Sequence, residues 1–227
     1  MSQSSKVANA TPVSTLAEQT AKVRDEFIAS QPDEDKAIIG AAMEKLMASD
    51  FGARALNVGD RIPHFTLPNA SGEPVAIADY IAKGPVVLSF YRGGWCPFCN
   101  LEFKALSEAL PAIRERGATL IGVSPELPDV AQQTVSQHNI PFEVLSDVGN
   151  EVIKQFGLLT YVYEEMRPLY LKWGLDVPAH NGDERWEMPI PATYVIDEQG
   201  VIRAGYVNKD YTQRMEPAEI IDALDKL

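Results

Sequence analysis

Two apolar runs rich in β-branched residues constrain the fold of this chain more than any other feature. Residues 85–91 read PVVLSFY and residues 118–124 read ATLIGVS. Runs of this kind, apolar without alternation, are typical of strands in a sheet whose two faces are both covered. The segment between them has a helical stripe of apolar residues, namely Leu106, Ala109, Leu110 and Ile113. Strand, helix and strand in this order predict an α/β fold with helices on both faces of the sheet.

Weaker signals extend this pattern toward both ends of the chain. A hairpin is predicted for residues 62–77, because the turn sequence NASG separates two short apolar segments. The later part of the chain predicts a helix at 129–138, a strand at 142–145, a helix at 148–156, a hairpin at 193–207 and a closing helix at 217–227. The whole order predicts a central mixed sheet flanked by helices.

The chain divides into three parts of different composition. Residues 1–13 are polar and aperiodic, which predicts a disordered tail. Residues 14–56 predict a helical N-terminal arm of two helices, the first opened by a capping box from Thr15 to Glu18. This arm either packs on the core as a helical hairpin or joins two copies into a homodimer. Residues 57–227 form the main domain, with an insert at about 158–188 that predicts a helix and a loop.

The net charge of the chain limits the classes of partner that it is expected to bind. Acidic residues number 32 against 20 basic ones, and the net charge of −12 argues against binding to nucleic acid or to an anionic membrane. No apolar run reaches the length of a membrane span, and the N-terminal residues lack the apolar segment of a secretory signal. We therefore expect a cytoplasmic, reducing location.

The only two cysteines lie three residues apart in the stretch WCPFC, directly after the first apolar run. A bridge between Cys96 and Cys99 would close too small a loop to restrain the unfolded chain much. A chemical role is therefore favoured over a structural one, and in a reducing compartment that role is catalytic or metal-binding. We expect no metal, because the histidines show no zinc-ligand spacing: His64, His138 and His180.

The position of the two cysteines predicts a different chemical role for each thiol. Cys96 follows a buried strand and precedes a helix, where unpaired backbone N–H groups and the helix dipole favour a thiolate. Cys99 lies one turn further on, within reach of the first sulfur. We therefore expect Cys96 to be the exposed nucleophile and Cys99 the shielded, resolving thiol.

These motifs together resemble the thioredoxin superfamily, because IPATYVID and a hairpin lie downstream of WCPFC. The finer resemblance is to its peroxiredoxin-like branch, the alkyl hydroperoxide reductase/thiol-specific antioxidant type. Three segments carry it: NVGDRIPHFTLPNASGEPVAIADY, LIGVSPELPDVAQQTVSQHNIPFEVLSDVGNEVIKQFGL and ATYVIDEQGVIRAGYV. The resemblance covers about residues 57–227 apart from the insert. It implies a thioredoxin fold of the peroxiredoxin-like kind, to which the helical arm is an extension.

The resemblance also implies an activity, the reduction of hydrogen peroxide or organic hydroperoxides. Cys96 would become a sulfenic acid, and Cys99 would condense with it to a disulfide. Thioredoxin, glutaredoxin or a similar reductant would restore the dithiol, and no bound cofactor is implied. A protein disulfide oxidoreductase and a redox-sensing interaction protein are the alternatives.

Around the cysteines the sequence departs from the usual peroxiredoxin pattern. That pattern has a Pro and a Thr ahead of the cysteine and an Arg late in the chain, whereas FYRGGW precedes Cys96 and PA stands at 191–192. Arg92 or Arg167 would have to supply the missing charge. Trp95 would line the substrate groove or belong to the core. Pro191 is expected to be cis and to face the cysteines, as the corresponding proline of thioredoxin folds does.

Aromatic residues are concentrated in the insert, and two roles are open for them. They would either line a substrate pocket or anchor the insert on the core. The residues concerned are Tyr161, Tyr163, Trp173 and Trp186.

Overall fold

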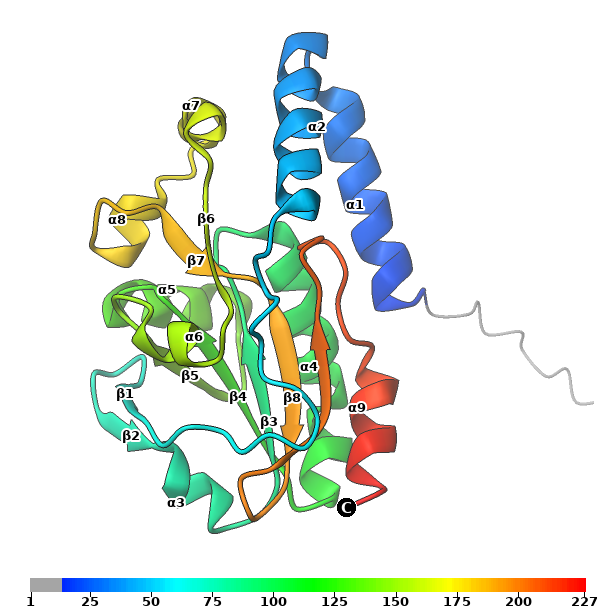
Figure 1. The fold of residues 1–227 in the computed structure, drawn as a ribbon. Helices are drawn as coiled ribbons and strands as arrows, with labels where there is room; N and C mark the ends of the chain where they lie inside the picture. Colours follow the sequence, from blue (N-terminus) through cyan, green and yellow to red (C-terminus); the bar gives the residue numbers. More distant parts are fainter. Residues whose placement is uncertain (1–13) are drawn as a thin grey trace, which may run out of the picture.

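A five-stranded mixed sheet forms the centre of the protein, whose computed structural model describes residues 14–227 (Figure 1). The tail predicted for residues 1–13 lies outside the described residues. The strand order is β5–β4–β3–β8–β9, and β3 runs parallel to β4 and antiparallel to β8. The predicted mixed sheet is therefore confirmed. The strands are β3 (Val86–Phe90), β4 (Thr119–Ser124), β5 (Glu143–Ser146), β8 (Ala192–Ile196) and β9 (Ile202–Val207).

Strand β3 shows why the sheet is covered on both faces. All five of its residues are buried, and successive side chains point to opposite faces. Val86, Leu88 and Phe90 enter one hydrophobic cluster, whereas Val87 enters a second cluster on the other face. The apolar run in the sequence is thus explained by burial on both sides.

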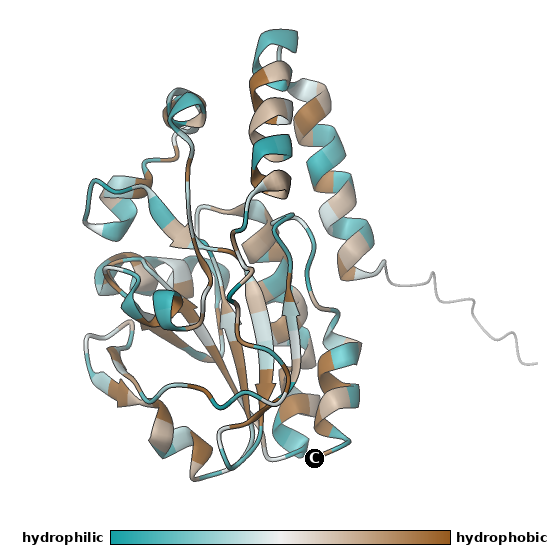
Figure 2. Cartoon of the chain, viewed as in Figure 1, coloured by the Kyte–Doolittle hydropathy of each residue, from teal (hydrophilic) through white to brown (hydrophobic). Residues whose placement is uncertain are grey.

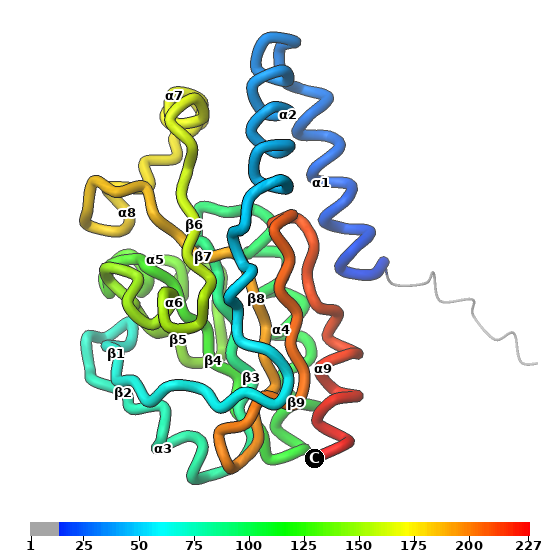
Figure 3. The backbone as a smooth tube through the Cα atoms, in the orientation of Figure 1, coloured from blue at the N-terminus to red at the C-terminus, as the bar shows by residue number. Residues whose placement is uncertain are grey.

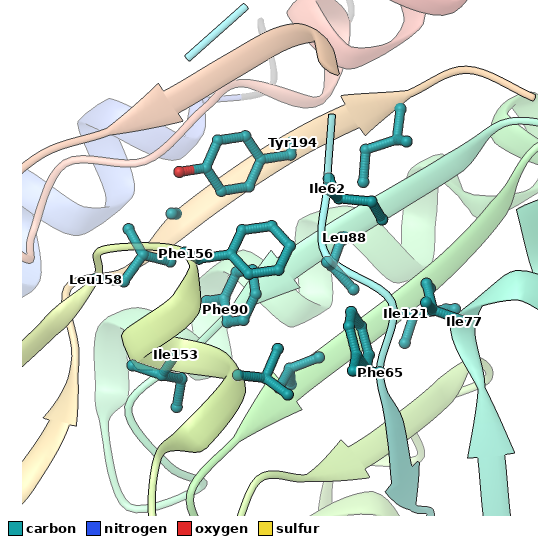
Figure 4. Packing of buried hydrophobic residues seen from close by; sticks show 14 of the residues in the cluster. Ile62, Phe65, Ile77, Leu88, Phe90, Ile121, Ile153, Phe156, Leu158 and Tyr194 are labelled. Carbon is teal, nitrogen blue, oxygen red and sulfur yellow. The ribbon is translucent and has the colours of Figure 1, made fainter. Parts of the chain in front are cut away.

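The first cluster packs under the N-terminal hairpin of the domain and the short helix α6 (Figure 4). Its aromatic centre joins Phe90 to Phe156, with ring centroids 4.7 Å apart. The elements over this face are β1 (Thr66–Pro68), β2 (Pro74–Ala76), α3 (Ile77–Ile81) and α6 (Glu151–Gln155). The hairpin and the helix predicted for this part of the chain are confirmed.

The second cluster packs under three longer helices and includes both cysteines. The longest, α4, places its predicted apolar stripe against the sheet. Its exposed residues include Lys104, Glu108, Arg114 and Glu115. Brown, hydrophobic residues predominate in the strands of the sheet that it covers (Figure 2). These helices are α4 (Pro97–Glu115), α5 (Pro128–His138) and α9 (Pro217–Leu224). None of the helices in residues 14–227 is both long and apolar enough to cross a membrane.

The N-terminal arm is a helical hairpin of α1 (Leu16–Ser30) and α2 (Asp33–Ala48) that extends beyond the sheet (Figure 3). The predicted capping box at Thr15 is present. Helix α1 packs on α4, and the backbone N–H groups of Leu16 and Ala17 donate to the Glu216 carboxylate at 3.1 and 2.8 Å. The arm therefore packs on its own domain, as the first alternative predicts. A homodimer formed through it remains a prediction.

The insert differs from the predicted helix and loop. It begins and ends in a two-stranded antiparallel sheet, with three short helical segments between the strands. The predicted helix is present as these short segments, but the sequence does not predict the two strands, because each has only three residues, too few for an alternating pattern to show. The segments are β6 (Leu159–Tyr161), η1 (Glu164–Met166), α7 (Arg167–Lys172), α8 (Val177–Asn181) and β7 (Glu187–Pro189).

A third hydrophobic cluster joins the arm to the insert. Ile39 and Ala42 of α2 pack there with Tyr170 and Met188 of the insert. Polar contacts reinforce the junction, since Lys172 lies 2.7 Å from the buried Asp35 carboxylate. The arm and the insert thus form one structure beside the carboxyl end of β3.

Candidate active site

The pair of cysteines lies at the start of α4, as the sequence predicts. Cys96 is the N-cap residue with an extended backbone, Pro97 occupies the first turn, and Cys99 follows inside the helix. Proline is favoured there because the first helical N–H groups have no partner within the helix. Both cysteines are free thiols in this structure.

The loop between β3 and α4 is held by a buried carboxylate. Glu126, which follows β4, accepts hydrogen bonds from the Gly94 backbone at 3.0 Å and from the Tyr91 hydroxyl at 3.2 Å. Position 94 needs glycine, because a Cβ there would lie 2.1 Å from Thr134 Oγ1. This packing fixes the path of the backbone that delivers Cys96 to the helix.

Cys96 is fully buried, which corrects the expectation of an exposed nucleophile. The side chain of Arg92 lies over it, and the guanidinium Nη1 is 3.8 Å from the Cys96 sulfur. The sequence could not show this cover, because Arg92 is held in place by residues more than 70 positions away. Cys99 is shielded, as predicted.

The surroundings of Cys96 favour its thiolate. Burial by itself would raise the pKa of this thiol. The hydrogen bond from Cys99 and the positive charges of Arg92 and Arg214 outweigh burial and lower the pKa to about 5. Burial first, and then the neighbouring Cys96 sulfur, raise the pKa of Cys99 well above its ordinary value. Cys96 is thus the thiolate and Cys99 the proton-bearing partner.

Arg92 is held in place by residues of the insert and of the segment after β9. Its guanidinium donates to the Tyr170 hydroxyl and, through Nε, to the Met188 sulfur at 3.3 Å. It also stacks on two rings, 4.1 Å from the centroid of Tyr211 and 5.0 Å from that of Trp95. The insert therefore positions the charge that stabilises the Cys96 thiolate.

A second arginine lies beside Cys99. Nη2 of Arg214 is 3.4 Å from the Cys99 sulfur, and its Nε donates to Glu102 at 2.7 Å. Glu102 also accepts a hydrogen bond from the Thr193 hydroxyl at 3.1 Å. Burial raises the pKa of Glu102, and Arg214 and Thr193 oppose that rise. Each cysteine therefore has its own buried guanidinium.

The other predicted site residues have mixed outcomes. Trp95 is half-buried and borders both the second and third clusters, so it is a core residue that also touches Arg92. Among residues 14–227 there is no cis peptide bond, so the expectation of a cis Pro191 is wrong. The chain runs extended from β7 into β8 at this point, since the Ile190 N–H pairs with the Leu158 carbonyl.

Arg167 and His180 contact residues other than the cysteines. Arg167 donates to the Val162 carbonyl and lies over the Trp186 ring, so Arg92 is the residue that supplies the charge to Cys96. No group of metal-ligating side chains gathers within the described part of the chain. His180 instead faces the Glu126 carboxylate at 3.5 Å.

Several residues of the site were not predicted from the sequence. Glu102 had a signal, because it is a carboxylate within the apolar stripe of α4 next to Phe103 and Leu106. Arg214, Tyr170 and Tyr211 had none, since they come from loops and short helices that reach the site only through the tertiary fold.

Comparison with known proteins identifies the family of this chain. A sequence model described as "AhpC/TSA family" matches residues 58–205. The chain belongs to the AhpC/TSA family. The family resemblance inferred from WCPFC and the downstream hairpin is therefore confirmed, and the arm lies outside the matched residues.

Individual relatives of this AhpC/TSA protein are peroxiredoxins and a thiol-disulfide oxidoreductase. Peroxiredoxin Q of Populus jackii is 28% identical over 172 residues, covering 76% of this chain and 68% of that protein. The putative peroxiredoxin bcp of Coxiella burnetii is 27% identical over 150 residues, covering 66% and 87%. The thiol-disulfide oxidoreductase ResA of Bacillus cereus is 30% identical over 105 residues, covering 46% and 60%.

The fold is shared with solved peroxiredoxin structures. Peroxidoxin BcpB of Mycobacterium tuberculosis superposes with a TM-score of 0.59 at 21% identity, covering 76% of this chain and 98% of that one. This likeness shows the fold alone, and it confirms the predicted peroxiredoxin-like thioredoxin fold.

Removing the Tyr170 hydroxyl should weaken the grip on Arg92 without removing its charge. We expect Tyr170→Phe to raise the pKa of Cys96 by about one unit, which would slow its oxidation about fivefold at pH 5. The difference should vanish above pH 8, where both thiols are ionised. Tyr161→Phe, elsewhere in the insert, is the matched control. A constant ratio at all pH values would contradict this role for Tyr170.

Proposed function

We propose that this AhpC/TSA protein is a thiol-dependent peroxidase that uses Cys96 as its peroxidatic residue. The main observation in support is the contact between Arg92 and the Cys96 sulfur, which stabilises the thiolate. The thiolate attacks one peroxide oxygen, an S–O bond forms and the O–O bond breaks. The sulfur is oxidised by two electrons to a sulfenic acid, and the alkoxide or hydroxide that leaves takes up a proton as alcohol or water.

Cys99 then resolves the sulfenic acid. Its thiol loses a proton, its sulfur bonds to that of Cys96, and the S–OH bond breaks with release of water. The high pKa of Cys99 in the reduced state is consistent with this order, because only one of the two sulfurs is ionised before peroxide reacts.

The reductant follows from the product of this step. A disulfide between Cys96 and Cys99 needs a dithiol donor, and thioredoxin, glutaredoxin or a similar protein supplies it by exchange. We propose a reducing compartment such as the cytoplasm as the location, because the cycle consumes reduced dithiol continuously.

A second candidate is protein disulfide exchange. The ResA relative, whose printed name is thiol-disulfide oxidoreductase, supports it. In that case the Cys96 thiolate would attack a protein disulfide instead of a peroxide, and Cys99 would release the mixed disulfide.

Rapid-mixing oxidation of the reduced protein separates the two candidates. We expect hydrogen peroxide or an organic hydroperoxide to oxidise Cys96 orders of magnitude faster than it oxidises free cysteine at the same pH. Cys99→Ser should complete one turnover and hold a sulfenic acid, detectable by mass spectrometry after trapping. Cys96→Ser supplies the baseline. Oxidation at the rate of free cysteine, with rapid exchange against a protein disulfide, would replace the peroxidase with the second candidate.

A further inference from the structure

An apolar pocket opens next to Arg92 and is walled by both the arm and the insert. The space inside it that can hold the centre of a water-sized sphere is about 60 Å³. Helix α2 contributes one wall, with Ile39, Ala42, Met43 and Leu46. The rest of the lining comes mainly from the insert, with Tyr161, Tyr163, Met166, Tyr170 and Met188, and from Tyr211 after β9. Tyr161 and Tyr163 thus line a pocket, as one alternative in the sequence predicts, whereas Trp173 and Trp186 do not.

Two polar residues of the pocket lining have hydrogen-bonding groups to spare. Arg92 is one of them, and its Nη1 lies 3.8 Å from the Cys96 sulfur. A guanidinium has five N–H donors, and only three of those of Arg92 are used, by Cys96, Met188 and Tyr170. Thr160 adds a hydroxyl that is buried and has no partner among the described residues. These groups would be costly to bury without a ligand to accept or donate hydrogen bonds.

The second cation in the pocket is already engaged. The Lys209 ammonium donates to the carbonyls of Met47 and Ser49 at 2.6 and 2.7 Å, where α2 ends. Arg92 and Thr160 therefore offer unused hydrogen-bonding groups to a ligand, while most of the other lining residues are apolar or aromatic.

We infer that this pocket binds the apolar body of a bulky hydroperoxide and directs its O–OH group to Arg92, whose Nη1 lies 3.8 Å from the buried Cys96 sulfur. The inference rests on the proposed peroxidase function and adds the site that selects the substrate. The walls are rich in tyrosine rings and methionine sulfur, which contact aryl groups favourably. An aryl-substituted alkyl hydroperoxide thus fits better than hydrogen peroxide, which would leave the walls without a partner.

Selection by this pocket depends on the arm. Ala42 of α2 is buried against the pocket, whereas its neighbour Ala41 is exposed. Because the arm lies outside the residues matched by the family model, the selectivity is a property of this chain's extension. The reaction stays balanced as above: Cys96 is oxidised by two electrons and the hydroperoxide leaves as its alcohol.

The test compares cumene hydroperoxide with hydrogen peroxide in single-turnover oxidation of the reduced protein, followed by tryptophan fluorescence. We expect the rate constant for cumene hydroperoxide to be at least tenfold higher. Ala42→Phe fills the pocket and should lower the ratio of the two rate constants about tenfold. Ala41→Phe is the matched control and should keep the ratio within twofold of the unchanged protein.

Two further variants on α2 test the same inference in case Ala42→Phe does not fold. Met43 is half-buried and lines the pocket, whereas Met47 is exposed one turn further along α2. Met43→Glu should lower the ratio, since a carboxylate opposes an apolar ligand, and Met47→Glu should not. A ratio near one in the unchanged protein, or one that Met43→Glu leaves intact, would overturn the inference.

Binding of the unreactive product alcohol separates this inference from the proposed function. Calorimetry with 2-phenyl-2-propanol should show binding to the reduced protein that Met43→Glu weakens at least fivefold and Met47→Glu does not. Absence of such binding would overturn the pocket assignment even if both peroxides react rapidly. Slow oxidation by both peroxides would instead overturn the peroxidase itself, whatever the alcohol does.

Discussion

Replacing Arg92 with methionine should slow the oxidation of Cys96 by peroxide about 100-fold at pH 7. The pKa of Cys96 is lowered to about 5 although complete burial alone would raise it, and the Arg92 guanidinium lies 3.8 Å from the Cys96 sulfur. Without that charge we expect the pKa to return to its ordinary value or above. The thiolate fraction at neutral pH then falls from nearly all molecules to about one in a hundred.

The oxidation rates of the unchanged protein and of Arg92→Met should depend differently on pH. A thiol reacts only when ionised, which happens above its pKa, so oxidation of the unchanged protein should be nearly constant above about pH 6. The Arg92→Met rate should instead climb with pH and approach the unchanged protein only under alkaline conditions. Ultraviolet titration of the thiolate measures the two pKa values directly. Arg167→Met is the control, because Arg167 contacts Val162 and Trp186 rather than either cysteine. An unshifted pKa in Arg92→Met would show that the Cys99 hydrogen bond, the Arg214 charge and the helix start stabilise the thiolate without Arg92.

Arg214→Met should destabilise the fold by about 3–5 kcal/mol at neutral pH, because it leaves the carboxylate of Glu102 buried without its partner. The pair is separated by 2.7 Å, and each side chain is 2% exposed. Urea unfolding measures the loss. Arg116→Met is the matched control, since the Arg116–Asp225 pair at 2.8 Å is largely solvated and should contribute far less.

The loss should also depend on pH, with a sign set by Glu102. Burial already raises the pKa of this carboxyl, and removal of Arg214 removes the strongest opposing effect. A raised folded-state pKa means that the folded protein binds the proton more tightly than the unfolded chain does. Stability of the variant should therefore be greatest below the unfolded pKa and fall as pH rises through the folded one. The variant should thus recover part of its loss at pH 5. Equal losses at both pH values would indicate that packing, not charge, is what Arg214 supplies.

The two predictions concern different halves of one arrangement. Arg92 acts on the sulfur that meets peroxide, whereas Arg214 acts on the sulfur that closes the disulfide and on the buried carboxyl beside it. The usual family pattern of Pro, Thr and late Arg is absent from FYRGGW and from positions 191–192. In this chain, two buried guanidinium groups surround the pair instead.

Local sequence decided the parts of the fold whose signal is self-contained. The runs at 85–91 and 118–124 became β3 and β4, because a strand buried on both faces must be apolar throughout. The capping box at Thr15 begins α1. The helix that starts after Cys96 places Cys96 at its N-cap and Cys99 within the helix. Each of these features depends on residues within one element, so the sequence alone suffices.

Tertiary structure decided the environment of the thiols. Tyr170, Met188 and Tyr211 reach Arg92 across gaps of more than 70 residues, and no local pattern marks them. The same holds for the burial of Cys96, the trans geometry of Pro191 and the three-residue strands of the insert, each of which depends on what the folded chain places opposite it. The sequence thus determined that two thiols stand at a helix start. Only the fold determined which charges face them, because electrostatic and packing effects act through space and not along the chain.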